Sequence, residues 1–293
     1  MTYEQQKQFV NVLVENLSKI EAGVFIPSDW KPTDDFILER TTEGIVPVEH
    51  LIPKNKNGKV IYHLHGGGYI APLLDLYREV AVQYSQIAGG AEVFSIDYRL
   101  APTHKAPSAL EDSLSVYKWI LEQGYNPENI VFIGDSAGGN LVLTTMLYLR
   151  DNKLPLPKGA IIISPWACIE TKAGSREENK YNDLILGIND KFIYDEVMAS
   201  RYFKEENLKE PYVSPVYADY TGFPKLLIQS GSFEILKDDA LMVAEAARKA
   251  GVDVTHTIYK GQSHDFQIFV PDLEETKAAW IEMKNFIQEV FDG

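Results

Sequence analysis

The feature that most constrains the fold is the alternation, along the chain, of short apolar runs with longer segments of helical periodicity. A continuous apolar run is typical of a strand buried on both faces, and its alternation with helices indicates a parallel sheet covered by helices on both sides. The sequence therefore predicts the α/β class. The predicted strands are 60–64, 91–96, 130–133, 160–163, 226–229 and 254–258, and the clearest predicted helices are 108–123, 137–150, 240–250 and 273–291.

One long segment interrupts this alternation between Ile163 and Leu226, where the chain is rich in Glu, Lys, Asn and Tyr. Asn189 or Asp190 is a candidate cap for a helix inside it. The first 22 residues carry a second amphipathic pattern outside the alternation. Because no repeat or low-complexity linker divides the chain, we expect one domain over 1–293, with a cap formed by about 1–40 and by an insertion at about 168–215.

Charge and cysteine content exclude several functional classes. The chain has 28 basic and 42 acidic side chains, a net charge of −14, and so no basic field for nucleic acid or an anionic membrane surface. Its one cysteine, Cys168, cannot form an internal disulfide or by itself build a thiolate metal site. No apolar run approaches the length of a membrane span, and the N-terminus lacks the pattern of a secretory signal. We expect a cytoplasmic protein without a metal site.

The sharpest local signal is Gly134-Asp135-Ser136-Ala137-Gly138, which fits the pattern G-x-S-x-G between a predicted strand and a predicted helix. A serine at such a corner adopts strained backbone angles, and only small neighbours let the strand and the helix approach closely. The Ala137 amide and the positive end of the helix would then lie near an oxyanion formed at Ser136. The alternative is a glycine-rich turn whose serine is incidental.

A second glycine-rich segment, His65-Gly66-Gly67-Gly68, directly follows the predicted strand that ends at Leu64. Glycines let backbone N–H groups approach a ligand oxygen without a Cβ in the way, so Gly67 and Gly68 are candidate oxyanion donors together with Ala137. His65 is expected to brace the loop. A featureless tight turn is the alternative.

A serine nucleophile needs a base and an acid that orients the base. The base is predicted to be His264, in a loop after the last predicted strand. The acid is predicted to be Glu234, which follows strand 226–229, with Asp238 and Asp239 as alternatives near the start of the next helix. The competing histidines are His50, His63, His104 and His256.

With these motifs the sequence resembles the hormone-sensitive-lipase family of α/β-hydrolases, which shares the HGGG and GDSAGG signatures. The resemblance extends to Asp97-Tyr98-Arg99-Leu100-Ala101-Pro102, to Ile163-Ser164-Pro165-Trp166 and to Ser214-Pro215. It implies an α/β-hydrolase fold with a mostly parallel eight-stranded sheet flanked by helices and a helical cap. It also implies a triad of Ser136, His264 and an acid, an oxyanion hole from Gly67, Gly68 and Ala137, and a possible homodimer through an edge strand.

Two segments beside the predicted catalytic residues depart from the family pattern, as does the loop Thr103-His104-Lys105-Ala106-Pro107, which is expected to be structural. Glu234-Ile235-Leu236 stands where the family usually has Asp-Pro-Leu, which places the carboxylate one methylene further from the backbone. Ser263-His264-Asp265-Phe266 stands where His-Gly-Phe is common, which adds a charge beside the base.

The sequence thus predicts a serine carboxylesterase that hydrolyses short-chain esters of small molecules through an acyl-enzyme, without a cofactor. The charged insertion does not resemble the broad apolar lid of a lipase that acts at an oil interface. Tyr69 and the cap aromatics Phe9, Phe192, Tyr202 and Phe203 are candidate pocket residues or, alternatively, part of the cap core. The alternative functions are a deacetylase or amidase on the same scaffold and a noncatalytic ligand-binding homologue, against which His264 argues.

Overall fold

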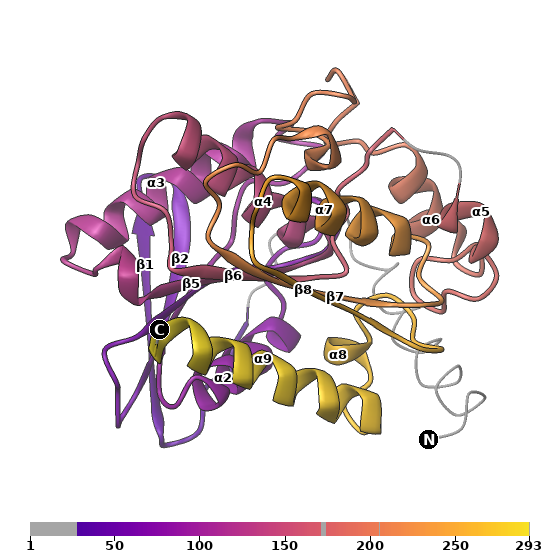
Figure 1. Cartoon of the computed structure of the whole chain (residues 1–293). Helices are drawn as coiled ribbons and strands as arrows, with labels where there is room; N and C mark the ends of the chain where they lie inside the picture. The colour runs from indigo at the N-terminus through magenta and orange to yellow at the C-terminus, as the bar shows by residue number, and fades with distance from the viewer. Residues whose placement is uncertain (1–27, 171–173, 205, 293) are drawn as a thin grey trace.

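An eight-stranded sheet forms the centre of the computed structural model, which describes residues 28–170, 174–204 and 206–292 (Figure 1). Its strand order is β1-β2-β4-β3-β5-β6-β7-β8; β1–β2 and β2–β4 pair antiparallel, and the remaining neighbours pair parallel. The strands are β1 (Phe36–Glu43), β2 (Val46–Pro53), β3 (Val60–Leu64), β4 (Glu92–Ile96), β5 (Ile130–Asp135), β6 (Gly159–Ile163), β7 (Lys225–Gly231) and β8 (Val254–Tyr259).

Helices cover both faces of the sheet (Figure 1). On one face lie α3 (Ser108–Glu122), α4 (Ser136–Asp151) and α7 (Lys237–Lys249), and on the other lie α2 (Asp75–Ile87) and α9 (Glu274–Asp292). The central strands β3, β4, β5 and β6 are buried at every position, as their continuous apolar runs require. None of the described helices is long and apolar enough to cross a membrane.

The predicted α/β architecture is confirmed. The six predicted strands correspond to β3 through β8, and the four predicted helices to α3, α4, α7 and α9. The sequence did not predict β1, β2 or α2. Strand β1, at the sheet edge, exposes most of its side chains and has the polar sequence FILERTTE, so it lacks the apolar run by which buried strands are recognised.

The segment between β6 and β7 contains α5 (Ser175–Glu178), α6 (Lys191–Met198) and the short 3-10 helix η2 (Pro215–Tyr217). Asp190 caps α6, because its side chain accepts a hydrogen bond from the Ile193 amide at 3.0 Å. Of the N-terminal segment expected to contribute to a cap, residues 36–40 belong to strand β1, and the amphipathic pattern of residues 1–22 lies outside the described residues.

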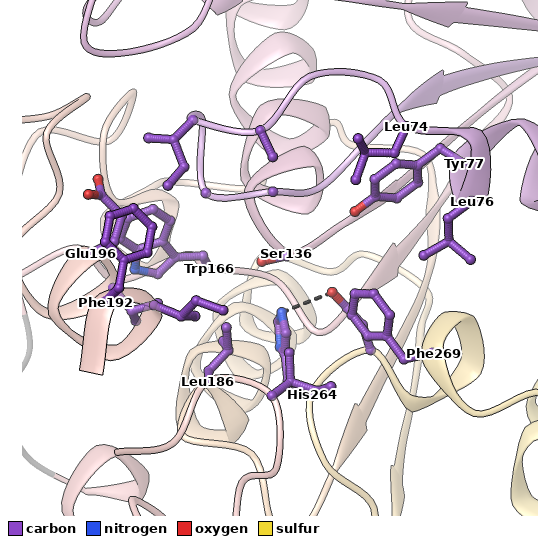
Figure 2. A pocket seen from close by; sticks show the side chains of 18 residues that line it. Leu74, Leu76, Tyr77, Ser136, Trp166, Leu186, Phe192, Glu196, His264 and Phe269 are labelled. Atoms are coloured by element: carbon purple, nitrogen blue, oxygen red, sulfur yellow. Dashed lines mark ion pairs between the residues drawn. The ribbon is translucent and has the colours of Figure 1, made fainter. Parts of the chain in front are cut away.

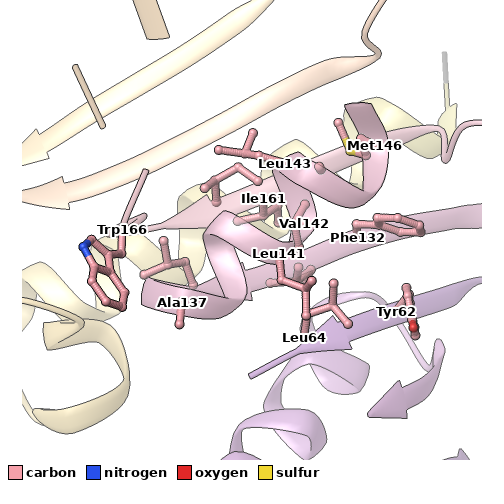
Figure 3. Close-up of a cluster of buried hydrophobic side chains, with 14 of the residues drawn as sticks. Tyr62, Leu64, Phe132, Ala137, Leu141, Val142, Leu143, Met146, Ile161 and Trp166 are labelled. Carbon is pink, nitrogen blue, oxygen red and sulfur yellow. The ribbon is translucent and has the colours of Figure 1, made fainter. Parts of the chain in front are cut away.

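The hydrophobic core is centred where α4 crosses strands β3, β5 and β6 (Figure 3). Side chains of these strands, such as Leu64 and Phe132, lie against Leu141 and Met146 of the helix, and all four are essentially inaccessible. Burial of this kind contributes about 25 cal/mol per Å² of apolar surface removed from water. The N-terminus of α4 is therefore held rigidly at the carboxyl edge of the sheet.

Candidate active site

Ser136 lies at the junction of β5 and α4, with a backbone φ of +52°. A residue with a side chain is strained in this left-handed region, and such strain is typical of a nucleophile turned outward between a strand and a helix. The Ser136 carbonyl accepts a hydrogen bond from the Trp166 amide at 3.0 Å, which helps to fix the corner. The serine is 7% exposed and lines a pocket.

The small residues of the corner are required by close backbone contacts. A Cβ at Gly138 would collide with the carbonyl oxygens of Leu64 and His65, and a Cβ at Gly134 would collide with the carbonyl of Gly138. At Gly138 the backbone of the helix therefore lies directly against the backbone at the end of β3. This packing explains why glycine stands on both sides of the serine.

The glycine-rich loop after β3 lies beside this corner. Gly67 and Gly68 have φ values of +106° and +64° and line the same pocket as Ser136. The Gly66 amide donates to Asp135 Oδ1 at 3.0 Å, which ties the loop to the residue before the serine. Ala137 lies in the first turn of α4, where backbone N–H groups have no acceptor within the helix. The three predicted oxyanion donors are thus near neighbours of Ser136.

His65 packs beneath this loop. Its Nδ1 hydrogen-bonds with the Gly66 carbonyl at 2.7 Å, and its ring stacks on Tyr98 with centroids 4.3 Å apart. His264, in contrast, lines the pocket with Ser136, and it is the one histidine among the described lining residues. The geometry therefore separates a histidine that supports the loop from a histidine that faces the cavity.

Glu234 follows β7 and is fully buried. Its Oε1 accepts hydrogen bonds from the Ser164 hydroxyl at 2.7 Å and from the Gly231 amide. Its Oε2 lies 3.6 Å from His264 Nδ1, within ion-pair range but longer than a hydrogen bond. Glu234 therefore faces the Nδ1 side of the histidine, as the predicted triad requires.

The two alternative acids are engaged elsewhere. Asp238 accepts a hydrogen bond from the Ser175 amide at 2.8 Å. Asp239 is buried, pairs with Arg176 and accepts hydrogen bonds from the backbone amides of Ala167 and Cys168. Both carboxylates bind segments of the insertion to the start of α7, and neither forms an ion pair with His264.

Asp265 occupies the other side of the histidine. Its Oδ2 lies 2.9 Å from His264 Nε2, the contact drawn as a dashed line in Figure 2. The residue is 1% exposed and has a left-handed backbone with φ of +49°. The sequence showed that a charge neighbours the base, but a backbone turn of this kind, which sets the direction of the side chain, has no sequence signature.

The insertion contributes a third buried carboxylate, Asp183, which the sequence did not single out. Its Oδ1 accepts hydrogen bonds from the amides of Ile185 and Leu186 at 3.1 and 3.2 Å, and from the His264 amide at 3.4 Å. Its Oδ2 accepts one from the Ile235 amide at 2.9 Å. Asp183 therefore connects the insertion to the loops that carry the histidine and the glutamate.

Asp265 and Glu234 both favour the charged form of His264. Burial lowers the pKa of His264, but the nearby Asp265 and Glu234 outweigh it, so that the pKa lies well above its usual value. Burial raises the pKa of Glu234 to about 7, although the neighbouring His264 acts in the opposite direction. The resting site thus favours a protonated imidazole between two acids.

The pocket is a mainly apolar cavity of about 100 Å³. Figure 2 shows Ser136 and His264 at its centre, with Trp166 and Phe192 on one side and Tyr77 and Phe269 on the other. Its volume is below the roughly 300–1,000 Å³ that is typical of pockets for drug-sized ligands. The cavity suits small substrates that lie across the serine.

Of the three residues predicted to contact substrate, the structure places only Phe192 among the described residues that line this pocket. Tyr69 and Tyr202 stack on each other with centroids 4.3 Å apart, and both are almost completely buried. Tyr69 donates to Asn140 Oδ1, and the Tyr202 hydroxyl accepts from the Ala109 amide, each at 2.8 Å. Phe203 packs against the same pair, whereas Phe9 lies outside the described residues. The two tyrosines pack the insertion against the loop after β3 and helices α3 and α4, so they are buried packing residues, the alternative that the sequence left open.

Comparison with known proteins gives a consistent result. A family model described as the alpha/beta hydrolase fold matches residues 61–268. An acetyl-hydrolase of Streptomyces hygroscopicus is 35% identical, over 81% of this chain and 78% of the relative, and an esterase of Acinetobacter venetianus is 32% identical, over 78% and 74%.

Solved structures show the same relationship. An esterase of the bacterial hormone-sensitive lipase family superposes with a TM-score of 0.85 at 30% identity, covering 99% of this chain and 100% of the other. The crystal structure of EstE5 soaked with p-nitrophenyl butyrate superposes with a TM-score of 0.83 at 33% identity, covering 97% of this chain and 99% of the other. With its strained serine, glycine loop and histidine in one pocket, the chain belongs to the α/β-hydrolase family, in the hormone-sensitive-lipase group of bacterial esterases.

Proposed function

We propose that this ester hydrolase is a serine carboxylesterase that acts on short-chain esters through an acyl-enzyme. Ser136 attacks the ester carbonyl while His264 removes its proton, and the amides of Gly67, Gly68 and Ala137 stabilise the oxyanion. The alcohol leaves with the proton from His264, and water then hydrolyses the acyl-enzyme by the same steps. The observation that carries the proposal is the presence of the strained Ser136 and of His264 in one pocket.

Glu234 is the proposed acid of the triad. It lies on the Nδ1 side of His264, so it can hold the ring with Nε2 toward the cavity and stabilise the imidazolium that forms when Ser136 loses its proton. The hydrogen bonds from Ser164 and Gly231 hold its other oxygen. A tightening from 3.6 Å to hydrogen-bond distance is expected when substrate binds, because catalytic hydrogen bonds are often long without it.

Two observations support short esters as substrates. The cavity is small, and the insertion beside it is rich in charged side chains rather than broadly apolar. A similar esterase was crystallised and soaked with p-nitrophenyl butyrate, an ester with a four-carbon acyl group. Small-molecule esters with acyl chains up to about butyl to hexyl length are therefore the proposed substrate class.

The test is hydrolysis of p-nitrophenyl acetate, butyrate, octanoate and palmitate by the wild type and by Ser136→Ala. We expect turnover of the short esters only, and a loss of kcat on the order of 10⁶-fold in the variant, because serine-hydrolase activity collapses without its nucleophile. The unfolding midpoint of the variant should match the wild type. Equal rates on palmitate, or an active Ser136→Ala variant, would contradict the proposal.

A second candidate is deacetylation, which the acetyl-hydrolase relative favours. The same tetrahedral chemistry serves esters and amides, so the triad alone does not separate them. Matched acetate esters and acetamides of one alcohol–amine pair distinguish removal of acetyl groups from esters and from amides. A higher kcat/KM on the acetamide would establish the amidase, and a higher kcat/KM on the ester would establish the esterase.

A further inference from the structure

Asp265 has a position that its usual structural role does not explain. It occupies the N-cap position of the short helix α8 (Phe266–Phe269), where an aspartate commonly accepts a hydrogen bond from the first helical amides. Its side chain makes no such bond. The carboxylate instead lies in the pocket beside His264.

The backbone at this residue also favours another amino acid. A φ of +49° is strained for a residue with a side chain, although aspartate tolerates it better than most. Glycine would adopt this conformation without strain. The site therefore holds a carboxylate at a position where glycine would be less strained.

One carboxylate oxygen of Asp265 has no partner. Oδ2 contacts His264 Nε2 at 2.9 Å, but Oδ1 is buried and accepts no hydrogen bond from any described residue. The hydroxyl of Tyr77, which lines the same side of the pocket, already donates to Asp135 Oδ2 at 3.0 Å. Buried carboxylate oxygens without a donor are costly, and a ligand with a donor group would satisfy this one.

The catalytic chemistry identifies which part of the substrate lies there. In the proposed reaction His264 Nε2 gives its proton to the leaving oxygen, so the alcohol part of the ester must lie next to Nε2. Asp265 is already in contact with that nitrogen. A hydrogen-bond donor on the alcohol part, rather than on the acyl part, would therefore lie nearer to the carboxylate of Asp265.

We propose that Asp265 is a specificity-determining residue that selects esters whose alcohol part carries a free hydroxyl group, as in a partial ester of glycerol or another polyol. A hydroxyl that donates to Asp265 would satisfy the unpaired oxygen and weaken the hold of the carboxylate on Nε2, which leaves that nitrogen available to Ser136. A neutral donor fits the mainly apolar lining of the pocket better than a cation does. The inference rests on the proposed esterase function.

The experiment compares 2,3-dihydroxypropyl butyrate with propyl butyrate, two esters that share their carbon skeleton and acyl group. We expect wild-type kcat/KM to favour the dihydroxy ester by about tenfold or more, the effect of one hydrogen bond to a charged group. Asp265→Asn and Asp265→Gly should each reduce this preference by about tenfold, measured as the ratio of kcat/KM for the two esters within each variant. Asparagine tolerates the left-handed backbone and glycine adopts it freely, so two independent variants test the site.

Asp272→Asn is the matched control, because Asp272 is an exposed carboxylate outside the pocket lining. Its ester preference should equal that of the wild type. Ser136-dependent turnover with the same preference in the wild type and both Asp265 variants would overturn the inference and leave the esterase function intact. Absence of Ser136-dependent turnover of both esters would overturn the esterase function and the inference together.

Discussion

Two segments supply the reacting groups, and they are held in place by different forces. The corner at Ser136 is fixed by packing: its backbone is strained, its glycines touch the end of β3, and the core around α4 is buried. The loop at His264 is held by three carboxylates. Glu234 lies near ring Nδ1, Asp265 contacts ring Nε2, and Asp183 accepts a hydrogen bond from the His264 amide. The comparison shows that close packing fixes the position of the Ser136 side chain, whereas contacts with carboxylates fix the position of the His264 ring.

The largest expected effect concerns the two acids of the histidine. Glu234→Gln should lower kcat on p-nitrophenyl butyrate by a factor on the order of 10⁴, as removal of the triad acid does in serine proteases. Asp265→Asn should change kcat on this hydroxyl-free ester by less than about tenfold. The substitution replaces a charged contact at His264 Nε2, the nitrogen that takes the proton of Ser136, by a neutral one. Steady-state kinetics of both variants measures the difference.

Asp238→Asn is the control for this pair, since Asp238 follows Glu234 closely but binds the Ser175 amide. Its kcat should remain within about threefold of the wild type, as expected for a carboxylate outside the reacting groups. A loss in Asp238→Asn as large as that in Glu234→Gln would show that the comparison has assigned the wrong acid.

The packing side of the comparison is tested at Gly138. Gly138→Ala places a methyl group against the carbonyls of Leu64 and His65, so the free energy of unfolding should fall by about 2–3 kcal/mol, the upper range for overpacking. The control is Gly124→Ala, where φ is +92° but no atom lies within 4 Å, and the expected loss is about 1 kcal/mol. Urea unfolding followed by circular dichroism measures both; equal losses would refute the packing argument.

The smallest expected effect is a shift in pH dependence. His264 acts as a base only when neutral, and its pKa is raised well above its usual value, so kcat/KM of the wild type should rise with pH above about 6.5. Asp265→Asn removes one of the two charges that stabilise the imidazolium, whereas Glu234 remains. The acid limb should therefore move to lower pH by about one unit.

The measurement is the pH profile of kcat/KM for p-nitrophenyl butyrate from pH 5 to 9, the range in which the histidine is expected to titrate. Asp272→Asn should give the wild-type profile. If the acid limb of the kcat/KM profile has the same midpoint in Asp265→Asn as in the wild type, Asp265 does not control the charge of His264.

Much of the fold could be predicted because the relevant signals are local. Strands β3 to β8 are continuous apolar runs, and α3, α4, α7 and α9 have clear helical patterns. Strand β1 could not be predicted, because it lies at the sheet edge with polar, exposed side chains, and the apolar run of β2 is interrupted by Pro47, Glu49 and His50. The roles of Tyr69 and Tyr202 were likewise open, because an aromatic residue can line a pocket or fill the space between two layers.

By itself the sequence determined the corner at Ser136, because a strand, a serine flanked by glycines and a helix impose their geometry on each other over a few residues. Only the tertiary structure decided the surroundings of His264. Asp183, Glu234 and Asp265 come from the insertion, from the loop after β7 and from a left-handed turn, and no local pattern states which carboxylate faces which nitrogen. Electrostatic contacts between distant segments depend on the packing that brings them together, and that packing exists only in the folded chain.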